Sequence, residues 1–231
     1  MRQRLGLATG LCGLALVLTA CNGGNGSGSE GDLASQSPSQ IITSARQALS
    51  SAQSVRVTGH ISQGSMTATL DITSFANGDY AGTFAVNGDS AQLKRIGGTD
   101  YLNASTSFYQ SQGTSSATAQ ALGGRWVSGT DTQIGLGSDF SLRSLASQFT
   151  APTGRVTKGP TGTVNGQTAV PLHSSSGTLW IATRHPNYPI QIVETGRTPG
   201  VVHFSDWNEG AAPTPPPGAV PVDSLSGTAA A

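Results

Sequence analysis

Cysteine and charge are both scarce in this chain of 231 residues. Of the two cysteines, Cys12 lies in an N-terminal segment that we expect to be removed, so a disulfide framework is excluded. Charged residues make up 10% of the chain, and the 12 basic and 12 acidic side chains cancel. This balance argues against a nucleic-acid partner and against a polybasic membrane patch.

Motifs that carry chemistry are scarce as well. The 4 histidines occur without HxH, HxxxH or CxxC spacing, so we predict no metal and no cofactor. No GxSxG motif is present, and the GxGxxG match at 26–31 follows no strand, which excludes a dinucleotide site. We therefore predict a protein that is not an enzyme. The alternative is a Ser, a His and an Asp brought together from distant strands.

The chain also lacks an apolar run long enough to span a bilayer, and a targeting signal occupies the N-terminus. Arg2 and Arg4 precede an uncharged run over 5–18, which has the length of a signal-peptide core. Residues 18–21, Leu-Thr-Ala-Cys, match the pattern of a bacterial lipobox. We predict a signal peptide over 1–20 and a diacylglyceryl anchor with palmitate-like chains on Cys21, which would hold the protein on the extracytoplasmic face of the cell membrane. An ordinary signal peptide that happens to contain a cysteine is the alternative.

Glycine, serine and turn signals are abundant by contrast. Their composition over 21–38 predicts a flexible tether behind the lipidated cysteine. The Ser37-Pro38-Ser39-Gln40 quartet predicts a capping box and a helix to about residue 53. From residue 54 the apolar period becomes two and Asn-Gly turns recur, which predicts an antiparallel meander. A loop over 104–122 that contains one helical turn, a second helix over 139–149 capped by Ser138, and further strands from 155 complete this pattern.

Together, these predicted helices and strands indicate an α+β fold that is mainly antiparallel β: a curved half-barrel sheet of about ten strands with helices covering its concave face. We place this single domain at 39–210 and a Pro-rich, extended or disordered tail at 211–231. A concave apolar face larger than two helices can fill leaves a cavity for an apolar ligand. Inward glycine or alanine at 59, 68 and 82 would widen it.

We predict that apolar residues from the strands and the second helix line this cavity. They are Val55, Val57, Ile61, Met66, Leu70, Ile72, Phe84, Val86, Leu102, Trp126, Leu142, Leu145, Leu179 and Ile181. Trp126, Trp180 and Trp207 have two interpretations, as sugar-stacking surfaces or as core, and indoles in an all-β domain are more often core.

Five short segments occur in a characteristic order: SVRVTGHIS, IGGTDYLNA, ALGGRWV, LWIATRHPNYPIQIV and FSDWNEG. Together with the capped helix before them, they resemble the LppX/LprG group of actinobacterial lipoproteins, whose domain is similar to LolA and LolB. Two details depart from that pattern. Ala182-Thr183-Arg184 stands where the group has an acidic or Asp-Pro element, and Asn187-Tyr188-Pro189 replaces Gly-Leu-Pro.

The resemblance implies a half-open barrel, lidded by helices, that holds acyl chains and takes part in lipid transfer or lipoprotein handling. We therefore expect a membrane-anchored lipoprotein that binds, and in the fullest form of the hypothesis transfers, a lipid or other amphiphile. The alternative is an envelope interaction or sensing lipoprotein, whose own side chains fill the concave face and whose protein partner the sequence does not identify.

Overall fold

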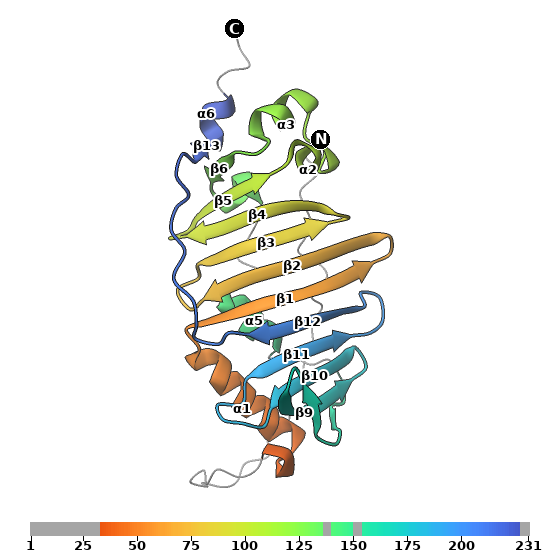
Figure 1. The fold of residues 1–231 in the computed structure, drawn as a ribbon. Coiled ribbons are helices and arrows are strands. Elements are labelled where there is room, and N and C mark those ends of the chain that lie inside the picture. The colour runs from red at the N-terminus through yellow and green to blue at the C-terminus, as the bar shows by residue number, and fades with distance from the viewer. Residues whose placement is uncertain (1–32, 136–139, 150–153, 227–231) are drawn as a thin grey trace.

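The structure is a computed structural model that describes residues 33–135, 140–149 and 154–226 (Figure 1). Its 13 strands form one sheet in the order β13-β6-β5-β4-β3-β2-β1-β12-β11-β10-β9-β7, with β8 paired to β9. Among the described pairs only β13 with β6 is parallel. In chain order the strands are β1 (Ser54–Gln63), β2 (Met66–Phe75), β3 (Tyr80–Val86), β4 (Asp89–Ile96), β5 (Thr99–Ala104), β6 (Trp126–Gly129), β7 (Thr157–Lys158), β8 (Gly162–Val164), β9 (Gln167–Ser174), β10 (Gly177–Ala182), β11 (Pro189–Glu194), β12 (Gly200–Ser205) and β13 (Val220–Pro221).

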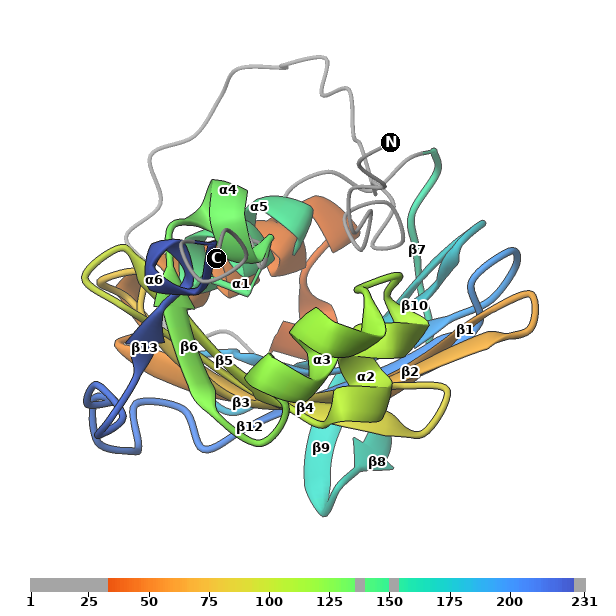
Figure 2. The same ribbon diagram turned by 90° about the horizontal axis from the view of Figure 1, so that it is seen from above.

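The sheet curls around the helices, which gather on its hollow side (Figure 2). The described helices are the 3₁₀ helix η1 (Leu33–Ser35) and the α-helices α1 (Pro38–Ser51), α2 (Thr106–Ser111), α3 (Ser116–Leu122), α4 (Asp131–Ile134), α5 (Leu142–Phe149) and α6 (Val222–Ser226). The predicted α+β half-barrel with helices on its concave face is confirmed.

Helix α1 begins as predicted. The Ser37 side chain accepts a hydrogen bond from the Gln40 backbone N–H, and the Gln40 side chain accepts one from the Ser37 backbone N–H at 2.9 Å. This capping box satisfies backbone donors that the first helical turn leaves free. The buried side of the helix includes Ile41, Ala45 and Leu49, the stripe expected from the sequence.

Glycines allow the central strands to curl closely past one another. A Cβ at Gly59 would lie 2.4 Å from the carbonyl oxygen of Val201, and one at Gly82 would lie 2.1 Å from that of Asp71. No side chain fits at such distances, so these positions serve the curvature of the sheet. The sequence suggested that they widen a cavity, but neighbouring backbone already occupies that space.

Two short helices lie where the sequence predicted a loop over 104–122 with one helical turn. Ser105 caps α2 by accepting from the Phe108 N–H at 3.1 Å, and Ser115 caps α3 by accepting from the Thr118 N–H at 3.3 Å. These serines were the available signal, but the segment has too little apolar periodicity to indicate helices. Helix α5 begins at residue 142 behind a Ser141 cap, whereas the predicted cap, Ser138, lies outside the described residues.

The two ends of the described chain belong to the domain. Leu33, which we assigned to the tether, is buried against α1 and the strands β9 and β10, and Lys158 donates to the carbonyl oxygens of Ala34 and Gln36. In the Pro-rich tail, Thr214 accepts a hydrogen bond from Lys94 at 3.0 Å. The tail then adds strand β13 beside β6 and ends in α6, so part of it is ordered structure. Cys21 and the predicted signal peptide lie outside the described residues.

Candidate functional site

The candidate site is the concave side of the sheet, called the inner face below. Cross-strand register sorts its residues into rows, since residues directly opposite in paired strands share one face. The covered row is Phe204, Val57, Ile72, Gly82, Leu93, Leu102 and Val127. The middle row is Leu172, Leu179, Ile192, Val202, Gly59, Leu70, Phe84, Ala91 and Ala104. The rim row is Ser174, Gly177, Glu194, Gly200, Ile61, Ala68, Val86 and Asp89.

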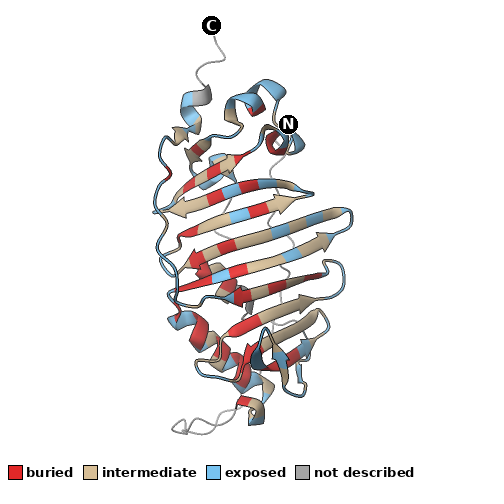
Figure 3. Ribbon diagram, in the orientation of Figure 1, coloured by how far each residue is buried: buried red, intermediate tan, exposed pale blue. Residues whose placement is uncertain are grey.

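Burial falls from the covered row to the rim row (Figure 3). Leu93 in the covered row is 0% exposed and Val57 is 4% exposed. In the rim row Ile61, Ala68 and Val86 are all only half-buried, although they belong to the same central strands. The inner face is therefore closed along one side and partly open along the other.

Helices account for the closed side. Leu142 and Leu145 of α5, together with Leu49 of α1, form one buried cluster with β1 and β12. Phe108 and Tyr109 of α2 form a second cluster with β3, β4 and β5. A third cluster joins the first half of α1 to β9 and β10. The described helices thus pack on the covered row and on both ends of the middle row.

Half-buried aliphatic side chains remain between these clusters, and we call them the open strip. They lie in the middle and rim rows as two groups, one on β10 and β11 and the other on β1, β2 and β3, and β12 between the groups contributes the buried Val202 and Gly200. The open strip comprises Leu179, Ile192, Leu70, Ile61, Ala68 and Val86. Partly accessible apolar side chains gathered on one face are typical of a surface that contacts a ligand or a partner.

The structure brings most of the predicted cavity residues to the inner face but leaves few of them accessible. Ile61, Leu70, Val86 and Leu179 belong to the open strip, and Met66 is half-buried at the hairpin beyond Ile61. The residues that are packed into the core are Val55, Val57, Ile72, Phe84, Leu102, Leu142, Leu145 and Ile181.

Trp126 does not lie on the inner face. It pairs with Asn103, whereas its neighbour Val127 pairs with Leu102, so Trp126 lies on the outer face. There the Lys94 ammonium sits 5.6 Å from the centre of its ring. Trp180 likewise pairs with Pro171 and Gln191 on the outer face, where the six-membered part of its ring packs over Gly162.

Carboxylates occur at two positions of the rim row. Glu194 is half-buried, and burial raises the pKa of its carboxyl, while a hydrogen bond with Thr198 opposes that shift. Asp89, at the other end of the row, accepts a hydrogen bond from Ser107 at 3.1 Å. The part of the open strip in the rim row, Ile61, Ala68 and Val86, therefore lies between two acidic groups.

A buried polar cluster lies beyond the covered row. Asp100 is 0% exposed and accepts hydrogen bonds from the Arg95 guanidinium at 2.9 and 3.2 Å. Burial raises the pKa of Asp100 to about 6, with Asp131 of α4 adding to the shift and Arg95 opposing it. Sequence reasoning missed this pair. The Gly97-Gly98 turn between β4 and β5 was the available signal, because it places residues 95 and 100 opposite each other.

One buried hydroxyl near the open strip has no partner. Tyr109 is 7% exposed, and its Oη makes no hydrogen bond among the described residues. Its neighbours are aromatic and aliphatic, including Phe108, whose ring centre lies 6.0 Å away in an edge-to-face arrangement. Burial raises the pKa of Tyr109 to about 12, which keeps it neutral.

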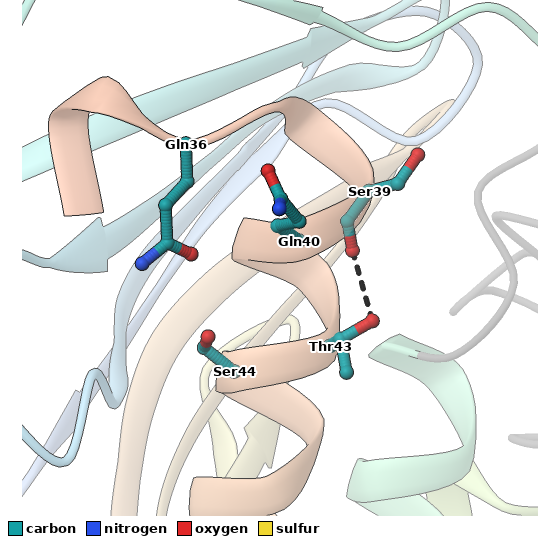
Figure 4. A pocket seen from close by; sticks show the side chains of 5 residues that line it. All are labelled: Gln36, Ser39, Gln40, Thr43 and Ser44. Carbon is teal, nitrogen blue, oxygen red and sulfur yellow. Dashed lines mark hydrogen bonds between the residues drawn. The ribbon is translucent and has the colours of Figure 1, made fainter. Parts of the chain in front are cut away.

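A hollow of about 410 Å³ lies beside the first turns of α1 (Figure 4). Hydroxyl and amide side chains line it, from Gln36, Ser39, Gln40, Thr43 and Ser44. Such side chains offer hydrogen-bond donors and acceptors to water or to a polar ligand. None of the residues predicted to line the apolar cavity lines this hollow.

Two histidines of the described residues have neutral partners. The His203 Nδ1 lies 3.1 Å from the Asn165 amide nitrogen, and the His173 Nδ1 lies 2.9 Å from the Thr178 hydroxyl. Over the described ranges, no three His, Cys, Asp or Glu side chains come together as a metal-binding group. No helix within those ranges has both the length and the apolar character needed to cross a membrane.

The register and the helix placement define an open half-barrel with a partly covered concave face. In comparisons with known proteins, no family model and no curated protein matches this chain. Its fold is similar to that of LprF from Mycobacterium bovis, with a TM-score of 0.51 and 16% identity over 76% of this chain and 95% of that one. Lipoprotein LppX from Mycobacterium tuberculosis gives a TM-score of 0.49 and 16% identity over 76% of this chain and 98% of that one. At 16% identity the likeness to LprF concerns the fold alone. For the fold, the resemblance inferred from the sequence is confirmed.

Proposed function

We propose that this chain is a lipid-anchored, extracytoplasmic protein that binds a lipid or other amphiphile along the open strip. The observation that carries this proposal is the open strip itself: aliphatic side chains that stay only half-buried on a concave face. Covering them with an alkyl chain removes apolar surface from water, at roughly 0.8 kcal/mol for each buried CH₂ group. Binding of this kind needs no cofactor, no nucleic acid and no covalent chemistry.

The targeting part of the proposal rests on the sequence. A signal peptide over 1–20, a diacylglyceryl anchor on Cys21 and a Gly/Ser tether that ends before Leu33 would attach the domain to the outer surface of the cell membrane. Cys21→Ser tests the anchor, because the variant should fold and appear in the soluble fraction. Firm membrane association of that variant would contradict the anchor.

Ligand binding is tested by native mass spectrometry of the mildly extracted protein and by titration with a fluorescent acyl probe. We expect co-purified lipid and saturable probe binding. Val86→Lys puts a charge on the open strip and should weaken probe binding at least tenfold. Thr83→Lys is the matched control, since Thr83 lies on the same strand but is exposed on the outer face. Equal binding by both variants would rule out the open strip as the ligand site.

The second candidate is an envelope interaction or sensing protein without a ligand. The observation in its favour is the aromatic cluster over β3 to β5, where Phe84 and Phe108 pack edge to face at 5.5 Å and fill that end of the inner face. This second function predicts that the protein is recovered without lipid and that it binds no acyl probe. Transfer of lipid between donor and acceptor vesicles would instead favour a carrier.

A further inference from the structure

Glu194 has an unusual position on the inner face. Its register partner on β10 is Gly177 and its register partner on β12 is Gly200, so neither neighbour in the rim row has a side chain beside it. Gly200 in turn pairs with Ile61, the first residue of the open strip in the rim row. The carboxylate therefore lies at one end of the apolar part of the rim row. The glycine on each side of it presents only backbone atoms.

The carboxylate is also electrostatically uncompensated. Within the described part of the chain, no Lys, Arg or His nitrogen lies within ion-pair distance of Glu194. Its hydrogen-bonding partner is Thr198, a neutral group. An ionised carboxylate accepts hydrogen bonds and donates none, so half-buried Glu194 retains capacity for further donors. Charge-assisted hydrogen bonds to such a group are roughly twice as strong as neutral ones.

We propose that Glu194 is the head-group site of the amphiphile whose chain lies on the open strip, and that it selects a head group that donates hydrogen bonds and has no negative charge. Ammonium groups and sugar hydroxyls share this chemistry. Asp89 at the other end of the row repels anions as well, so an anionic head group is disfavoured at both ends. This inference rests on the proposed function, because the head group binds only if the chain does.

The test compares three probes that share a dodecyl chain: dodecylamine, dodecyl maltoside and laurate, each below its critical micelle concentration. Isothermal titration of the mature full-length protein should show at least tenfold tighter binding of the amine or the maltoside than of laurate. The preferred probe identifies the source of the donors. In Glu194→Gln this preference should disappear and laurate binding should tighten.

Glu209→Gln is the matched control, since it makes the same change at an exposed site after β12 and should keep the preference. Glu194→Thr, a residue well suited to strands, is a second variant in case Glu194→Gln folds poorly. Equal affinity of the parent protein for all three probes, or an undiminished preference in both Glu194 variants, would overturn the head-group site and leave the proposed function intact. Binding of none of the probes would overturn the proposed function and this inference with it.

Discussion

Leu93 and Val86 lie on the neighbouring strands β4 and β3 and face the same side of the sheet, yet their surroundings differ. Leu93 is fully buried in the covered row, whereas Val86 is half-buried in the rim row. Strand alternation brings both side chains inward: Leu93 is a buried member of the cluster that includes residues of α2, whereas Val86 packs against that cluster and stays partly accessible. The same strand pattern thus provides core at one row and accessible apolar surface two rows away.

Truncating each side chain tests this comparison most strongly. Leu93→Ala should lower the free energy of unfolding by about 2 to 5 kcal/mol, because it leaves a cavity in packed core. Val86→Ala should cost about 1 kcal/mol, since its methyl groups are already partly in water. Urea unfolding of both variants measures the difference. Similar losses would show that the rim row is as well packed as the covered row.

The buried Asp100 makes the closed side of the inner face sensitive to pH. Its pKa is raised to about 6 in the folded protein, whereas an unfolded Asp has a pKa of about 3.9. Between these values the folded state binds a proton that the unfolded state does not, so stability should fall as pH rises through this window, by up to about 2 to 3 kcal/mol. Urea midpoints at pH 4.5 and 7.5 measure this contribution. Asp100→Asn should flatten it, and an unchanged slope in that variant would assign the pH dependence to other groups.

Gly82 tests whether the curl of the sheet depends on missing side chains. Gly82→Ala places a Cβ 2.1 Å from the Asp71 carbonyl oxygen, so the strands must move apart. We expect a loss of about 1 to 3 kcal/mol, measured by thermal or urea unfolding. Thr83→Ala, on the next residue and the exposed outer face, is the control and should change stability by less than about 0.5 kcal/mol. A tolerated Gly82→Ala would mean that the curvature does not require glycine there.

The smallest expected effect concerns the unpartnered hydroxyl of Tyr109. Because Tyr109 Oη is buried without a hydrogen bond, Tyr109→Phe should leave stability unchanged or raise it by up to about 1 kcal/mol. A calorimetric melting temperature measures this change. Clear destabilisation by Tyr109→Phe would reveal a partner for the hydroxyl in solution.

Much of the architecture was readable from the sequence because its signals are local. The Ser37 capping box, the period-two strands and the Asn-Gly turns each depend on a few adjacent residues. The assignment of Trp126 to the inner face was wrong because β6 has four residues, too few to define an alternation. Pairing with β5 decides which neighbour faces inward, and a shift of one residue exchanges the two faces.

The sequence by itself determined that this chain forms a curled antiparallel sheet with apolar inward positions and a capped helix to cover them. Only the tertiary structure decided which of those positions remain accessible. Val57 and Ile61 are both apolar inward residues of β1, but Val57 is covered by residues of α1 and α5 from other parts of the chain, whereas Ile61 is only half-buried. Accessibility depends on what packs across the sheet, and no pattern within a single strand contains that information.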